Sequence, residues 1–172
     1  MIKRRLKQEK FYENFMIVNI RKPQFCTIQQ INSADNHRKT EGAINMNITD
    51  LENNTIYING ESIDKISNIK WDKHPKFSGV FTKTLLTSKN SSNNLSAMIV
   101  KIDPLHEIGD HIHEGKYELH EILSGDGIGT IEDKKIEYKT GVISLIPGDI
   151  HHSIKAGDNG MILLAKFTPP LN

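Results

Sequence analysis

The sequence predicts an all-β domain, a barrel or sandwich of short antiparallel strands that follows an N-terminal extension. From Val80 onward, short alternating or apolar runs recur every eight to twelve residues, separated by Gly, Asp, Asn or Pro. These runs lack the periodicity of an amphipathic helix. At 172 residues with 37% apolar content, the chain is long enough for one domain with a substantial core plus an appendage.

The expected organisation is an N-terminal extension over residues 1–69 and a barrel over residues 70–172. The charged first 15 residues carry apolar side chains spaced for one face of a short helix, namely Leu6, Phe11 and Phe15. The polar, Asn-rich segment 27–54 predicts loops and one short strand.

A β-hairpin is expected where Ile56 and Ile58 alternate with polar neighbours before Asn59-Gly60. This dipeptide favours a tight hairpin turn. Unpaired sheet edges invite aggregation, so we expect the hairpin to extend a barrel sheet or to pack across a dimer partner.

Within the barrel region, the same alternation predicts a series of short strands. They are expected at 80–87, 96–102, 117–124, 127–132, 135–139, 142–146, 150–155 and 161–167.

Composition excludes several classes of protein. The 22 basic residues nearly balance the 21 acidic ones, so no strong field favours nucleic acid or a membrane surface as partner. Cys26 is the single cysteine, which excludes an internal disulfide framework and fits a reducing compartment. The N-terminus has basic residues without a following apolar signal region. We therefore expect a cytoplasmic protein.

The most informative segment begins at His111. Side chains alternate along a strand, so His111 and His113 are expected on one face, about 6–7 Å apart, where both can reach one metal ion. Glu118 begins the following predicted strand and can face the two imidazoles if that strand returns antiparallel beside the first. The pattern predicts a metal site.

A further histidine ligand is expected after the Pro147-Gly148 turn. If His152 points inward, alternation directs Ile154 inward as well. If His151 points inward instead, Ile154 faces outward. We favour His152 and keep His151 as the alternative.

These residues resemble two sequence motifs of the cupin family. The first motif, HxH, four residues, Glu, six residues, Gly, is matched by His111, His113, Glu118 and Gly125. The second motif, Gly, five residues, Pro-x-Gly, two residues, His, is approximated by Gly141, Pro147, Asp149 and His152. Leu105 and Asp149 stand where the family usually has glycine. Aligning Gly148 with the second of these glycines would make His151 the ligand.

The resemblance implies a double-stranded β-helix, or jelly-roll, barrel that is usually homodimeric. It also implies one divalent transition metal ion, Fe, Mn, Ni or Zn, held by three histidines and the glutamate. Imidazole and carboxylate ligands alone do not choose among these ions. Open coordination positions would then permit Lewis-acid or redox chemistry.

The expected function is that of a metal-dependent isomerase, lyase or dioxygenase acting on a small polar organic molecule. Glu118 and His120 are the candidate catalytic residues, with Glu118 as ligand and proton acceptor. His120 shares the face of Glu118 and is a candidate substrate contact, a support for a ligand or a barrel-wall residue. The alternatives are a non-catalytic small-molecule sensor and a scaffold whose metal holds strands together.

Overall fold

The computed structural model describes residues 48–171. The helix expected in the first 15 residues lies outside this range. In chain order the elements are α1 (Ile48–Glu52), β1 (Thr55–Ile58), β2 (Glu61–Lys65), the 3-10 helix η1 (Ile66–Asn68), β3 (Asp72–Lys73), β4 (Val80–Leu86), β5 (Ser96–Ile102), β6 (Glu107–His111), β7 (Tyr117–Ile131), β8 (Lys134–Lys139), β9 (Ile143–Ile146) and β10 (His152–Thr168).

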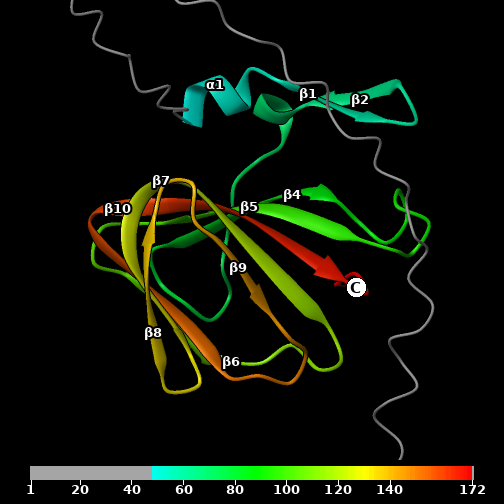
Figure 1. Cartoon of the computed structure of the whole chain (residues 1–172). Helices are drawn as coiled ribbons and strands as arrows, with labels where there is room; N and C mark the ends of the chain where they lie inside the picture. Colours follow the sequence, from blue (N-terminus) through cyan, green and yellow to red (C-terminus); the bar gives the residue numbers. More distant parts are fainter. Residues whose placement is uncertain (1–47, 172) are drawn as a thin grey trace, which may run out of the picture. The chain divides into compact units, whose positions relative to one another are not determined.

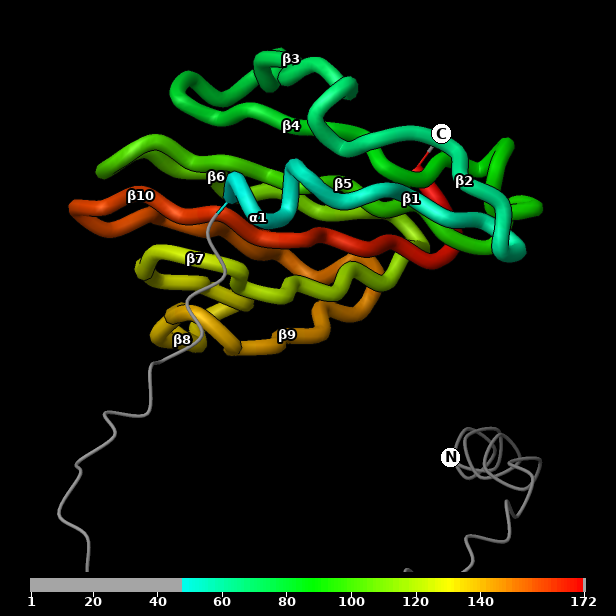
Figure 2. Tube along the Cα trace, turned by 90° about the horizontal axis from the view of Figure 1, so that it is seen from above, coloured from blue at the N-terminus to red at the C-terminus, as the bar shows by residue number. Residues whose placement is uncertain are grey.

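An eight-stranded antiparallel sheet forms the barrel (Figure 1). Its main path runs β3-β4-β5-β10-β7-β8, while β6 pairs with β10 and β9 pairs with β7. Figure 2 shows β4, β5, β10 and β7 following one another across the sheet. The predicted all-β jelly-roll class is confirmed.

Two long strands, β7 and β10, each join segments that the sequence predicts as separate strands. The breaks are bulges, because the register between the two strands shifts between Ala156 and Met161. Gly125 lies there with φ +81°, and a Cβ on it would approach the carbonyl oxygen of Gly160 to 2.1 Å. Glycines that predict turns in the sequence therefore lie at bulges within continuous strands.

The inward face of β7 carries Glu118, His120 and Ile122, all of them buried. Cross-strand pairing sets Glu118 opposite Phe167, and His120 opposite Ala165, on β10. Apolar side chains from several strands complete the core: Val80, Val100, Ile102, Ile108, Tyr138, Ile154, Ala156, Met161 and Leu163. The polar side chains thus lie on the wall of an otherwise apolar interior.

The segment before the barrel departs in part from its prediction. Helix α1 occupies residues 48–52, where loops or a strand were expected. Strands β1 and β2 form the predicted hairpin around Asn59-Gly60, and both turn residues have positive φ. Within residues 48–171 the hairpin is a separate two-stranded sheet, so the expectation that it extends a barrel sheet is wrong. Its packing across a dimer partner stays a prediction.

A buried ion pair connects this segment to the barrel. Lys83 on β4 is 3% exposed, and its Nζ lies 2.6 Å from Oε1 of Glu52 on α1. The same Nζ donates to the carbonyl of Ile66 at 3.3 Å and lies 4.9 Å from the centre of the Trp71 ring. Residues that precede the barrel therefore cover Lys83 on the outer face of β4.

Among residues 48–171, no helix has the length and apolar character needed to cross a lipid bilayer.

Candidate metal centre

Four potential ligands converge inside the barrel although they come from four places in the chain. His111 ends β6, His113 lies in the next loop, Glu118 is near the start of β7, and His152 begins β10. One nitrogen or oxygen donor from each side chain lies within 4.8 Å of the others. This spacing is compatible with a single shared cation.

The pairing of β6 with β10 brings two of these imidazoles together. His111 and His152 are direct register partners, and their ring centres are 4.2 Å apart. In each ring Nδ1 lies 2.9 Å from the carbonyl oxygen two residues earlier, that of Gly109 or Ile150. A carbonyl only accepts, so Nδ1 carries a proton in each ring, and Nε2 is the atom through which each ring could bind a cation.

His113 reaches the cluster from a loop, and the expectation that it shares a strand with His111 is wrong. Strand β6 ends at His111. The carbonyl of His113 accepts the backbone N–H groups of Lys116 and Asp149, each at 3.2 Å. The Asp149 carboxylate in turn accepts the N–H of Gly115 at 3.0 Å. These contacts hold the loop so that the His113 ring centre lies 5.0 Å from that of His111.

The strand order also differs from the expected one. We expected the strand of Glu118 to run beside that of His111, but β6 pairs with β10 and not with β7. Strand β10 therefore lies between them, with His152 paired to both His111 and Ile131. Glu118 reaches the imidazoles through the barrel interior. Pairing between segments so distant in sequence leaves no local signal.

Glu118 is 5% exposed and contacts three imidazoles. Its Oε2 lies 2.9 Å from Nε2 of His152 and 3.3 Å from Nε2 of His113. Its Oε1 lies 2.8 Å from Nε2 of His120. Ring nitrogens thus contact both oxygens of the carboxylate.

The electrostatics of the cluster favour an ionised carboxylate beside imidazoles. Burial alone would raise the pKa of Glu118, but hydrogen bonds from the three imidazoles hold that pKa well below its ordinary value. Burial lowers the pKa of His111 and outweighs its hydrogen bond to Gly109. Burial also acts to lower the pKa of His152, but its hydrogen bond to Glu118 raises that pKa overall. A buried negative charge beside a neutral His111 ring is a setting suited to a cation.

The structure separates the two candidate histidines of the second motif. His152 is buried in the cluster, and Ile154 is buried on the same side, as alternation predicts. His151 is exposed, and its Nδ1 lies 2.7 Å from Oδ2 of Asp110. His152, and not His151, is therefore the residue that approaches Glu118.

The two departures from the cupin motifs occupy positions that still need a glycine-like backbone. Leu105 has φ +64° and Asp149 has φ +66°. Both values lie in the left-handed region that glycine adopts most easily. Asp149 offsets this cost through its bond to Gly115, whereas Leu105 is exposed and gains no such bond in the structure.

Two aromatic side chains that sequence reasoning did not assign to the site lie beside it. The Phe77 ring lies 6.0 Å from the His111 ring and stacks on His74 at 4.8 Å. A Cβ on Gly109 would lie 3.1 Å from Phe77, so the glycine leaves room for this ring. On the other side, Phe167 lies 5.0 Å from the His113 ring. Phe77 precedes the motif by more than 30 residues, and no spacing rule relates the two.

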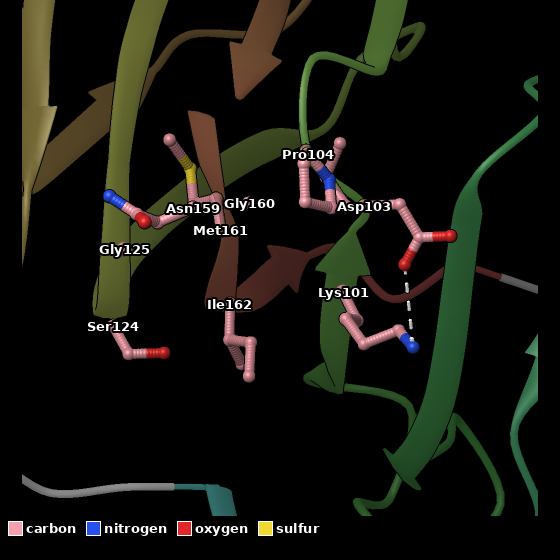
Figure 3. A pocket seen from close by; sticks show the side chains of 10 residues that line it. Lys101, Asp103, Pro104, Ser124, Gly125, Asn159, Gly160, Met161 and Ile162 are labelled. Atoms are coloured by element: carbon pink, nitrogen blue, oxygen red, sulfur yellow. Dashed lines mark ion pairs between the residues drawn. The ribbon is translucent and has the colours of Figure 1, made fainter. Parts of the chain in front are cut away.

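A cavity of about 150 Å³ lies elsewhere in the barrel (Figure 3). Its lining includes Lys101 and Asp103, whose side chains form an ion pair at 3.5 Å, together with Ser124 and Met161. None of the four clustered side chains lines it. This cavity is therefore separate from the candidate metal centre.

Comparison with known proteins identifies the fold. No family model matches the chain. An oxalate-binding protein of Thermotoga maritima is 29% identical over 98 residues, which is 56% of this chain and 77% of that protein. The crystal structure of a "predicted oxalate decarboxylase" from Thermotoga maritima has a TM-score of 0.55 and 25% identity, and the match covers 61% of this chain and 96% of that chain. KdgF from Halomonas sp. has a TM-score of 0.55 and 20% identity over 62% of this chain and 91% of its own.

Other matching structures are described as cupins, among them an RmlC-like cupin of Shewanella frigidimarina with a TM-score of 0.52. The two motifs, the antiparallel strand order and these structural neighbours agree. The chain therefore has the fold of the cupin proteins.

Proposed function

We propose that His111, His113, Glu118 and His152 hold one divalent transition metal ion, at which the barrel binds a small organic acid. The observation that carries this proposal is the convergence of four donor atoms within 4.8 Å of one another. Three imidazoles and one carboxylate suit Fe, Mn, Ni or Zn. A bound ion of this kind would supply a Lewis acid to polarise a carboxylate or carbonyl group.

The hydrogen bonds and charges of the four side chains support binding of such an ion. The carbonyls of Gly109 and Ile150 hold the Nδ1 atoms of two imidazoles, as partners of metal-binding histidines commonly do, so that the ligand atom of each ring is Nε2. The ionised Glu118 supplies one negative charge against a divalent cation. The cluster is more open on the side of His111 and His113, since Glu118 and His152 are buried, and we assign the approach of the organic acid to that side.

The class of ligand is inferred from the relatives. The curated relative carries oxalate binding in its name and the similar Thermotoga maritima structure is described as a predicted oxalate decarboxylase, so a short dicarboxylate is the first candidate. For an enzyme, Glu118 is the group placed to accept a proton, with His120 in contact with it.

Elemental analysis of protein purified without an affinity tag tests the metal site. The wild type should carry about one ion per chain, as expected for a single mononuclear site. The His111→Ala/His113→Ala double variant and His152→Ala should carry none. His151→Ala is the matched control, because its exposed side chain lies outside the cluster, and it should retain the ion. Metal retained by the double variant or by His152→Ala would overturn the proposal.

A second candidate, binding without turnover, is favoured by the name of the oxalate-binding relative. Calorimetric titration of the metal-loaded protein with oxalate, run beside an assay for formate and carbon dioxide, separates the two. An enzyme converts one hydrogen oxalate ion into one formate ion and one carbon dioxide molecule. A binding protein gives heat of binding and no product.

The homodimeric state and the cytoplasmic location stay predictions. Sedimentation of the purified protein tests the first, and fractionation of the source cells tests the second.

A further inference from the structure

We propose that His120 and Tyr138 are positioning residues that restrict Glu118 to a single ligand oxygen. This inference rests on the proposed function, because it concerns how Glu118 meets a metal ion. In this inference His120 orients the ligand Glu118 and is not itself a ligand. Tyr138, which sequence reasoning did not assign to the site, supports His120.

The contacts of His120 define the arrangement. The ring is 1% exposed, so bulk water does not compete for its nitrogens. Its Nε2 lies 2.8 Å from Oε1 of Glu118, and its Nδ1 lies 3.1 Å from the hydroxyl oxygen of Tyr138. A carboxylate only accepts, so the Nε2–H group of His120 donates the hydrogen bond to Glu118. Nδ1 of the same ring is then the acceptor of the hydrogen bond from the Tyr138 hydroxyl group.

The position of Tyr138 is itself determined by the sheet. Tyr138 lies on β8 opposite Gly127 of β7 and is buried. A Cβ on Gly129, two residues further along β7, would lie 2.5 Å from Cζ of Tyr138. The ring therefore occupies space that a side chain at Gly129 would fill.

The two oxygens of Glu118 consequently have different surroundings. Oε1 is engaged by His120, whereas Oε2 faces His113 and His152. A carboxylate with both oxygens free can bind a cation through one or both of them. By engaging Oε1, His120 would keep this oxygen from a bound ion, and one coordination position would then be left for the organic ligand.

Cobalt(II) is the probe, because its visible absorption reports coordination number without any turnover. Protein is loaded with Co²⁺ alone, its spectrum and affinity are recorded, and oxalate is then added. In His120→Ala and Tyr138→Phe the Co²⁺ spectrum should change. Affinity for Co²⁺ or for oxalate should change by about ten-fold or more in His120→Ala, as for other losses of groups that orient a ligand. His120→Gln keeps an N–H donor and should restore the wild-type spectrum in part.

Tyr57→Phe is the matched control, since it removes a hydroxyl from an exposed tyrosine outside the barrel sheet. Tyr138→Phe keeps the ring that fills the space beside Gly129 and removes only the hydroxyl group, so this variant should fold. It therefore tests the positioning role even if His120→Ala does not fold. Wild-type protein that binds no Co²⁺ refutes the proposed function. If wild-type protein binds Co²⁺, and Tyr138→Phe and folded His120→Ala give the same spectrum as wild type, the metal site stands and the positioning role of His120 and Tyr138 is refuted.

Discussion

Replacing Glu52 by Gln tests whether the segment before the barrel is part of the same folding unit. The Glu52 carboxylate contacts Lys83, whose side chain is 3% exposed on the outer face of β4. The substitution keeps the size of residue 52 and removes its charge. Lys83 is then a buried cation without an anionic partner.

The expected cost follows from the remaining contacts of Lys83. Removing one partner of a fully buried ion pair costs about 3–5 kcal/mol. Here Glu52 is 28% exposed, and Lys83 keeps the Ile66 carbonyl at 3.3 Å and the Trp71 ring at 4.9 Å. We therefore expect Glu52→Gln to lower the free energy of unfolding by about 2 kcal/mol. Lys83→Met removes the charge but keeps the apolar stem, so we expect a change within about 1 kcal/mol.

Equilibrium unfolding in urea, followed by tryptophan fluorescence, measures this difference. Trp71 is the only tryptophan in the chain and lies beside Lys83, so it reports on this contact. The control is Glu121→Gln, which removes an ion pair at 3.0 Å to Lys166 at a more exposed position. We expect that control to cost less than about 1 kcal/mol. A loss in Glu52→Gln no greater than in the control would refute the reasoning.

Three further predictions concern backbone, packing and metal. Leu105→Gly should raise stability by about 0.5 kcal/mol in thermal melts, because relief of the left-handed strain exceeds the added chain entropy; Asp149→Gly, which also loses the bond to Gly115, should show no such gain. Gly129→Ala should lower the free energy of unfolding in urea by about 1–3 kcal/mol, because the new Cβ would meet the Tyr138 ring. A divalent ion at 100 times its Kd should raise Tm by about 5–10 °C, and an unchanged Tm would contradict the metal site.

Local alternation predicts most of the barrel strands. The expected strand 96–102 coincides with Ser96–Ile102, and the expected 135–139 differs from Lys134–Lys139 by one residue. The joining of strands in β7 and β10 was not predicted, because Gly125 has the same sequence signal in a bulge as in a turn. Strand β6 was expected only as the strand of His111, and its pairing with β10 depends on the assembled barrel.

In the candidate site, too, local alternation predicts some features, and contacts between distant segments determine the others. The period of two along β10 relates His152 to Ile154, so the sequence alone favours the histidine that the structure brings to Glu118. His113 lies in a loop, and its approach depends on backbone bonds to Lys116 and Asp149 that spacing does not reveal. The spacing of the ligands in the motif thus identifies the residues, but it does not predict the backbone hydrogen bonds that hold them in place.

His120 shows why the surroundings of a ligand are harder to predict than the ligand. Alternation places His120 on the face of Glu118, and this relation needs only one strand. Its second contact, to Tyr138, depends on the register of β7 with β8 and on a glycine that admits the tyrosine ring. Each of these conditions is set by pairing between strands, so only the folded barrel brings them together. Which Glu118 oxygen contacts His120 and which one faces His113 and His152 therefore depends on the sheet as a whole.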